Sequence, residues 1–155
     1  MTQPVDRRFR RLTLAIMVLL VLEFLVGMWV NLFVTISSHH PGAATRYGMG
    51  AAAGIGWALT AGPRALGLHV ALGLVLGACA LLHTATVRGR PAVGSLLWSL
   101  VGLGGVLGAA SSGAAFLDDG APLHSLLMSL GFAVALVGYG MAMTPGRPRD
   151  APPPS

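Results

Sequence analysis

Three histidines stand inside apolar stretches of this chain. His69 and His124 each lie a few residues inside the same end of a predicted membrane helix, and His83 follows His69 by fourteen residues, roughly 21 Å along a helix axis. Ionisable side chains are rare within membrane segments and are usually functional there. Because neutral imidazole is a common axial ligand of haem iron, two imidazoles at one membrane depth predict a haem site between them.

The composition predicts a membrane protein. Of the 155 residues, 54% are hydrophobic and 10% are charged, and the formal net charge of +5 comes from ten arginines without lysine. A soluble domain of this size does not normally have that balance. The arginines cluster beside apolar runs, so we interpret them as topology signals and expect no nucleic-acid partner. Cys79 is the single cysteine, which excludes an intrachain disulfide and a CxxC haem attachment.

Four apolar stretches are long enough to cross a bilayer, which needs about 20 residues. They predict an all-α membrane protein, a bundle of four transmembrane helices at residues 12–35, 65–87, 93–115 and 122–143. We interpret the first stretch as a retained helix, because its apolar region is too long for a signal peptide and no small-residue cleavage site follows at once.

The arginines also predict an orientation. Eight of them fall on one side of the predicted helices: Arg7, Arg8, Arg10, Arg11, Arg88, Arg90, Arg147 and Arg149. The positive-inside rule then places both termini in the cytoplasm and the protein in the cell membrane. The basic N-terminus (1–11) and a disordered proline-rich tail (144–155) are cytoplasmic in this interpretation. His69 and His124 come near the outer face and His83 near the cytoplasmic face.

The long outer loop, residues 36–64, contains an apolar run at 49–61 that is too short to span a membrane. It predicts an interfacial helix or a re-entrant segment, and we favour an outer cap over the bundle. His39 and His40 are adjacent and lack obvious further ligands, so we expect solvated loop residues there more than a metal site. Arg46 and Arg64 flank the predicted mouth, where a guanidinium would pair with a haem propionate or anchor the chain at the interface.

Glu23 is a carboxyl in the middle of the first helix. Burying it charged costs on the order of 3 kcal/mol, so we expect it to face the bundle. It is a candidate catalytic or proton-path group and could balance the charge of ferric haem, or it is a neutral carboxyl bonded to a neighbouring helix. Asn31, two turns further along, is predicted near the level of His69 as a contact for an imidazole or a propionate.

His83 is a possible ligand of a second haem. The position fourteen residues after His124 is Gly138, however, so the fourth helix offers no matching ligand at that depth. Glycines such as Gly73 and Gly131 follow the helix-two and helix-four histidines at helical spacing. They either make room for a flat macrocycle or allow close helix packing.

A four-helix unit with cytoplasmic termini and single histidines near the outer ends of helices two and four resembles one half of a haem A synthase. The resemblance covers most of residues 12–143 and rests on topology and on His69 and His124. It implies a bis-histidine haem b site and oxidation of a haem methyl group. The synthases carry a glutamate three residues before the helix-two histidine. Here that position is Leu66, so the catalytic carboxylate is missing unless Glu23 substitutes for it, and the loop cysteines of some members are absent.

Three classes of function follow. The leading hypothesis is a membrane protein that binds haem b through His69 and His124 in electron transfer or haem handling, as a homo-oligomer or with a respiratory-chain or haem-pathway partner. A cofactor-free accessory or assembly subunit is the alternative, with glycine faces that pack against larger partners. The third class is half of a proton-coupled transporter, with Glu23 and His83 as its pair.

Overall fold

The computed structural model describes residues 6–37, 39–43, 50–87 and 93–144, and within them the chain is helical, with no strand. The helices are α1 (Asp6–Phe33), α2 (Ala51–Thr60), α3 (Arg64–Val87), α4 (Val93–Asp119) and α5 (Pro122–Ala142). All except α2 are long and apolar enough to cross a membrane. The predicted all-helical class with four candidate membrane spans is thus confirmed.

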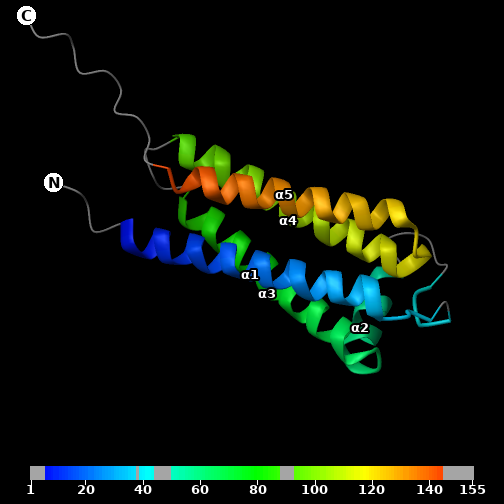
Figure 1. Ribbon diagram of the computed structural model, residues 1–155. Helices are drawn as coiled ribbons and strands as arrows, with labels where there is room; N and C mark the ends of the chain where they lie inside the picture. Colours follow the sequence, from blue (N-terminus) through cyan, green and yellow to red (C-terminus); the bar gives the residue numbers. More distant parts are fainter. Residues whose placement is uncertain (1–5, 38, 44–49, 88–92, 145–155) are drawn as a thin grey trace, which may run out of the picture.

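The four long helices lie side by side, and α2 packs at one end of the bundle (Figure 1). We call this the α2 end; α1 begins and α5 ends at the opposite end. The pairs α4 with α5 and α1 with α3 pack against each other, and α1 with α5 and α3 with α4 join the pairs. In the described part of the chain α3 and α5 make no close backbone approach, so they are diagonal partners.

Two helices extend several residues beyond their predicted bounds. α1 begins at Asp6, six residues before the predicted start at 12, and α4 continues to Asp119, four residues past 115. Arginine is a good helix former, so the basic segment continues the helix beyond its apolar part. The apolar run in the long loop, for which an interfacial helix or a re-entrant segment was expected, contains the short helix α2. The predicted tail, apart from Thr144, and the arginines at 88, 90, 147 and 149 lie outside the described residues.

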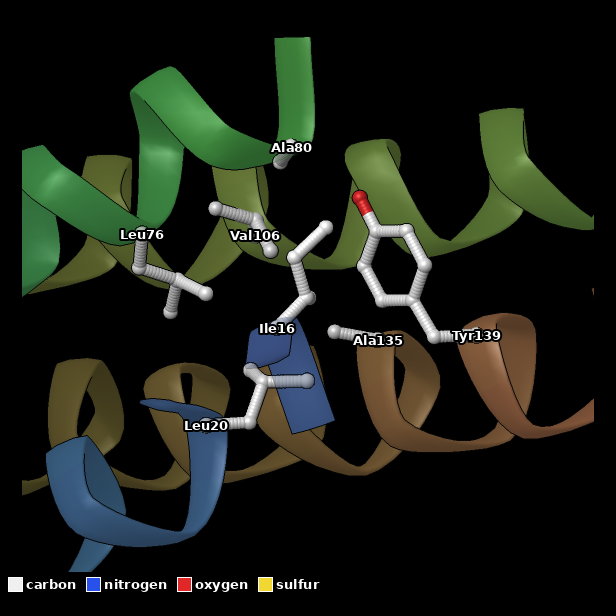
Figure 2. Packing of buried hydrophobic residues seen from close by; sticks show 7 residues of the cluster. All are labelled: Ile16, Leu20, Leu76, Ala80, Val106, Ala135 and Tyr139. Carbon is white, nitrogen blue, oxygen red and sulfur yellow. The ribbon is translucent and has the colours of Figure 1, made fainter. Parts of the chain in front are cut away.

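The core lies where the four long helices meet. Figure 2 shows its central cluster, which comprises Ile16 and Leu20 of α1, Leu76 and Ala80 of α3, Val106 of α4, and Ala135 and Tyr139 of α5. Large apolar side chains also cover the outside, among them Leu25, Phe33, Leu82 and Leu130. A surface that is apolar all round is typical of a bundle surrounded by lipid.

Glycines bring α4 and α5 together. A Cβ added at Gly105 of α4 would overlap the backbone of Ala135, and one at Gly131 of α5 would come 2.7 Å from the backbone nitrogen of Ala109. Small residues permit this close approach in membranes. The glycines at 131 and 138, on the predicted fourth membrane helix, therefore pack against α4.

Candidate functional site

Glu23 of α1 and His69 of α3 meet inside the bundle. Glu23 Oε1 lies 3.0 Å from His69 Nδ1, and the two side chains are 5% and 15% exposed. His69 Nδ1 is buried. In the described chain it contacts this carboxylate oxygen, and no contact of Nδ1 there has the geometry of a hydrogen bond. Glu23 Oε2 is buried too and has no hydrogen-bond partner in the described chain. The prediction that Glu23 faces the bundle is confirmed.

Two glycines make room for this pair. A Cβ at Gly27, one turn after Glu23 on α1, would lie 2.8 Å from His69 Cε1. A Cβ at Gly73, one turn after His69 on α3, would lie 2.9 Å from Glu23 Oε1. Each helix thus carries a polar residue and, four residues later, the glycine that receives the polar side chain of the other helix. This reciprocal spacing was the signal in the sequence that could have revealed the pairing.

A partly open cleft of about 150 Å³ lies against the pair. Glu23, Asn31 and His69 supply its polar groups, and its apolar wall includes Ile55 of α2, Val106 and Leu117 of α4, and Met128 and Phe132 of α5. A smaller recess of about 20 Å³ shares His69, Asn31 and Met128 with the cleft. Asn31 Oδ1 accepts a hydrogen bond of 3.4 Å from Ser125 Oγ. Asn31 and His69 line both the cleft and the recess, so the structure brings Asn31 near His69.

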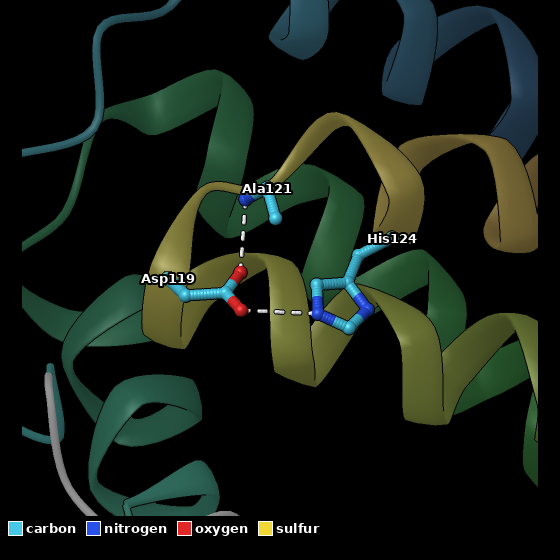
Figure 3. Close-up of polar contacts among 3 residues, drawn as sticks. All are labelled: Asp119, Ala121 and His124. Atoms are coloured by element: carbon cyan, nitrogen blue, oxygen red, sulfur yellow. Dashed lines mark hydrogen bonds and ion pairs between the residues drawn. The ribbon is translucent and has the colours of Figure 1, made fainter.

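His124 lies outside the residues that line the cleft and the recess. Figure 3 shows its ring beside Asp119, with His124 Nε2 3.1 Å from Asp119 Oδ2. Asp119 Oδ1 accepts a 2.9 Å hydrogen bond from the backbone N–H of Ala121. The His124 and Asp119 side chains are 25% and 53% exposed. His69 and His124 both lie at the α2 end, near the starts of α3 and α5, but the structure brings His69 to Glu23 and His124 to Asp119.

His83 lies near the opposite end of the bundle and is fully buried. The Thr13 hydroxyl donates its single proton to the Phe9 carbonyl at 2.9 Å, so it accepts from His83 Nε2–H, also at 2.9 Å. The rings of Phe9 and Tyr139 pack on His83 with centroids 4.8 and 5.3 Å away. His83 therefore sits in a packed cluster, and Glu23 contacts His69 and not His83.

His40 is buried, with 7% exposure, contrary to the expectation of a solvated loop residue. Its Nε2 lies 2.8 Å from the Leu117 carbonyl, and its ring stacks on Trp57 of α2. Trp57 covers the ring, which the sequence did not indicate. His39 is exposed, and its backbone N–H donates to Ser37 Oγ. Arg64 is exposed at the start of α3, whereas Arg46 lies outside the described residues.

In the described part of the chain, no three His, Cys, Asp or Glu side chains gather into a group that could hold a bare metal ion. Comparison of the sequence and the structure with protein-family models, with curated proteins and with solved structures finds no match. The chemistry of the cleft is therefore the basis for a functional proposal.

Proposed function

We propose that this protein binds haem b in the cleft, with His69 of α3 and His124 of α5 as axial ligands, and serves electron transfer or haem handling in the cell membrane. The contact between His69 Nδ1 and Glu23 carries the proposal. Histidines that ligate metals usually direct their other ring nitrogen at a carboxylate, which fixes the tautomer and the orientation of the ring. With the proton on Nδ1, His69 Nε2 is unprotonated and free to bind iron, because no hydrogen bond engages it in the described structure.

The residues of the cleft have the chemical groups that haem binding requires. An imidazole lines a mostly apolar cleft, and the buried carboxyl group of Glu23 next to it would offset the positive charge of ferric iron. The volume of about 150 Å³ is below the roughly 300–1,000 Å³ of common ligand pockets, so binding must widen the cleft. Widening is feasible between α3 and α5, because their backbones make no close approach in the described chain and side chains such as Phe132 line the cleft.

His124 must leave Asp119 to reach the cleft. An ion pair this open to solvent contributes little to stability, so a bond to iron easily replaces it. Six-coordinate haem, when bound, supplies one-electron redox chemistry. Arg64 would pair with a propionate, with Arg46 as a further predicted partner, and Asn31 would donate a hydrogen bond at the same level.

We infer that the α2 end faces the outside of the cell. Arg7, Arg8, Arg10 and Arg11 lie in the first turns of α1, at the opposite end of the bundle. Positive residues beside a span favour the cytoplasmic side. The proposed haem would therefore lie near the outer face.

Glu23 also bears on the resemblance to haem A synthases. Leu66 is a buried core residue at the position of the family glutamate, yet Glu23 brings a carboxylate to the helix-two histidine from α1. We assign Glu23 as the positioning residue of His69. Oxidation of a haem methyl group is not part of the proposal.

Absorption spectra of the haem-supplied protein in lipid nanodiscs, oxidised and reduced, test the proposal. We expect the sharp reduced bands of a six-coordinate low-spin haem, lost in His69→Ala and converted to a five-coordinate spectrum in His124→Ala. His39→Ala is the matched control and should match the wild type. A stable, colourless protein would contradict haem binding and favour the cofactor-free accessory subunit.

A further variant tests which residue of α5 is the second ligand of the haem iron. Met128 lines the cleft one turn after His124, and thioether sulfur also ligates haem iron. We expect Met128→Leu to keep the six-coordinate spectrum. If it loses that spectrum while His124→Ala keeps it, the second ligand is Met128.

One observation favours a second function. A buried carboxylate with an oxygen free of hydrogen bonds, inside a membrane span and next to a histidine, is typical of proton relays. We infer that any proton-coupled transport would use Glu23 and His69, in place of the predicted Glu23 and His83. Proton uptake by haem-free protein in liposomes that is lost in Glu23→Gln would support this role; its absence in the wild type would exclude it.

A further inference from the structure

One oxygen of the Glu23 carboxyl group has no partner. Oε1 lies 3.0 Å from His69 Nδ1, whereas Oε2 is buried and has no hydrogen bond to a described residue. The Glu23 side chain is 5% exposed, so solvent scarcely reaches it. A buried acceptor without a donor is unfavourable, and more so when it carries charge. A molecule that donates a hydrogen bond to this carboxyl group would therefore be bound favourably.

The cleft brings a bound molecule next to this carboxyl group. Glu23 is among the residues that line the cleft, and the terminal torsion of a glutamate side chain has broad energy minima, so the carboxyl can turn toward a donor there. The one basic side chain of the lining is His69, whose Nδ1 already contacts Oε1. No lysine or arginine belongs to the lining in the described chain. The cleft therefore favours a cationic donor over an anion.

The cleft has the size of a single ring. Its volume is about 150 Å³. An apolar cavity of about 150 Å³ is large enough for benzene, whereas haem requires that the cleft widen. Phe116 and Phe132 contribute aromatic side chains to the wall, and such rings pack against another ring or attract a cation. A small molecule with a ring-sized apolar body therefore fits the cleft as it stands.

We propose that the haem-free cleft binds a lipophilic ammonium ion, a protonated amine attached to one aromatic ring or to an aliphatic group of similar size. Its N–H group donates a hydrogen bond to the Glu23 carboxylate, and its apolar body lies against the wall that includes Val106 and Phe132. An apolar molecule without a donor would leave the carboxylate oxygen unbonded. This site goes beyond the proposed function, because it requires neither axial ligation nor proton transport.

Titration of the haem-free full chain with benzylammonium, in nanodiscs of uncharged lipid, tests the proposal. Met128 lines the cleft, whereas Met141 lies near the end of α5, at the opposite end of the bundle. With ¹³C-methyl-labelled methionine, the ring current of the probe should shift the Met128 signal and leave the Met141 signal unchanged. Benzyl alcohol, a neutral probe of the same shape, should bind on the order of tenfold more weakly, because hydrogen bonds between charged groups are the stronger ones. Equal affinities of the two probes, equal shifts at both methionines, or no shift at Met128 would overturn the proposal.

A pair of variants assigns the charge that binds the probe. Glu23→Gln should lower the affinity for benzylammonium to that for benzyl alcohol and leave the affinity for benzyl alcohol unchanged, which shows that the cleft is still folded. Asp119→Asn removes a carboxylate outside the lining of the cleft, so this matched control should bind benzylammonium as the wild type does. An unchanged affinity in Glu23→Gln, or an equal loss in Asp119→Asn, would refute the site.

The comparison of the two probes needs no variant, so it decides by itself if Glu23→Gln does not fold. Because no haem is added, the amine site and the haem site succeed or fail independently. Binding of benzylammonium without a haem spectrum would support the amine site alone, and a haem spectrum without binding of benzylammonium would refute the amine site alone.

Discussion

The side chains of Glu23 and His69 each occupy the space left by a glycine on the other's helix. Glu23 Oε1 lies where a Cβ at Gly73 would come within 2.9 Å, and His69 Cε1 lies where a Cβ at Gly27 would come within 2.8 Å. The polar contact and the close packing of α1 against α3 are thus one structural feature. A change at any of these four positions should affect both stability and the cleft.

Removing the Glu23 carboxylate should weaken the proposed haem site. Glu23→Ala frees the His69 ring to rotate, and loss of an outer partner of a ligating histidine typically costs 10–100-fold in metal affinity. Glu23→Gln keeps the shape of the side chain and an acceptor oxygen, so this variant should lose less haem affinity than Glu23→Ala. Titration of the haem-free protein with haem, followed by absorption, gives both affinities. Equal affinity of Glu23→Ala and the wild type would remove Glu23 from its positioning role.

Gly27→Ala should disturb the site from the other side. The new methyl group forces the His69 ring to shift, and overpacking of this kind costs about 1–3 kcal/mol in the free energy of unfolding. Gly77→Ala on α3 is the matched control, because a Cβ there meets nothing within 4 Å. Reversible unfolding in mixed micelles, followed by circular dichroism, compares the two. A Gly27→Ala protein as stable as Gly77→Ala would show that the His69 ring adapts freely.

Alanine substitutions at Gly104 and Gly105, neighbours on α4, should change the free energy of unfolding very differently. Gly105→Ala places a methyl group against the backbone of Ala135 on α5, which cannot yield without separating the helices. Gly105→Ala should lower the free energy of unfolding by at least the about 1–3 kcal/mol of ordinary overpacking. Gly104→Ala meets open space and should be neutral or stabilising by up to about 1 kcal/mol through helix propensity. The same unfolding measurement decides, and similar losses for both variants would contradict the packing of α4 on α5.

Thr13→Val should destabilise the opposite end of the bundle. The variant keeps the shape of the side chain but leaves buried His83 Nε2 without its hydroxyl partner, a loss of about 1–3 kcal/mol. Thr86, which is exposed and bonds the His83 backbone carbonyl, provides the control. Thr86→Val should change the free energy of unfolding by less than about 0.5 kcal/mol. If both variants unfold alike, the hydroxyl of Thr13 does not stabilise His83.

Hydropathy and length were enough to predict the four long helices, whereas the short apolar run that contains α2 allowed either an interfacial helix or a re-entrant segment. In a membrane every backbone polar group must bond within its segment, so a long apolar run is helical whatever its neighbours are. The cost of a buried charge likewise predicted that Glu23 faces inward, and the structure confirms it. These properties are local, or depend only on the surrounding lipid.

The partner of each histidine was decided by the tertiary structure. Depth along a helix follows from counting residues, and it matched His69 with His124. The rotation of each helix and the choice of neighbours do not follow from depth, because they depend on which small residues let two backbones approach. Glycines at 27 and 73 turn Glu23 and His69 toward each other, and α3 and α5 lie diagonally, with His124 beside Asp119. The sequence by itself therefore determined which side chains lie in the long apolar helices and at what level along them, and only the packed bundle decided which of them meet.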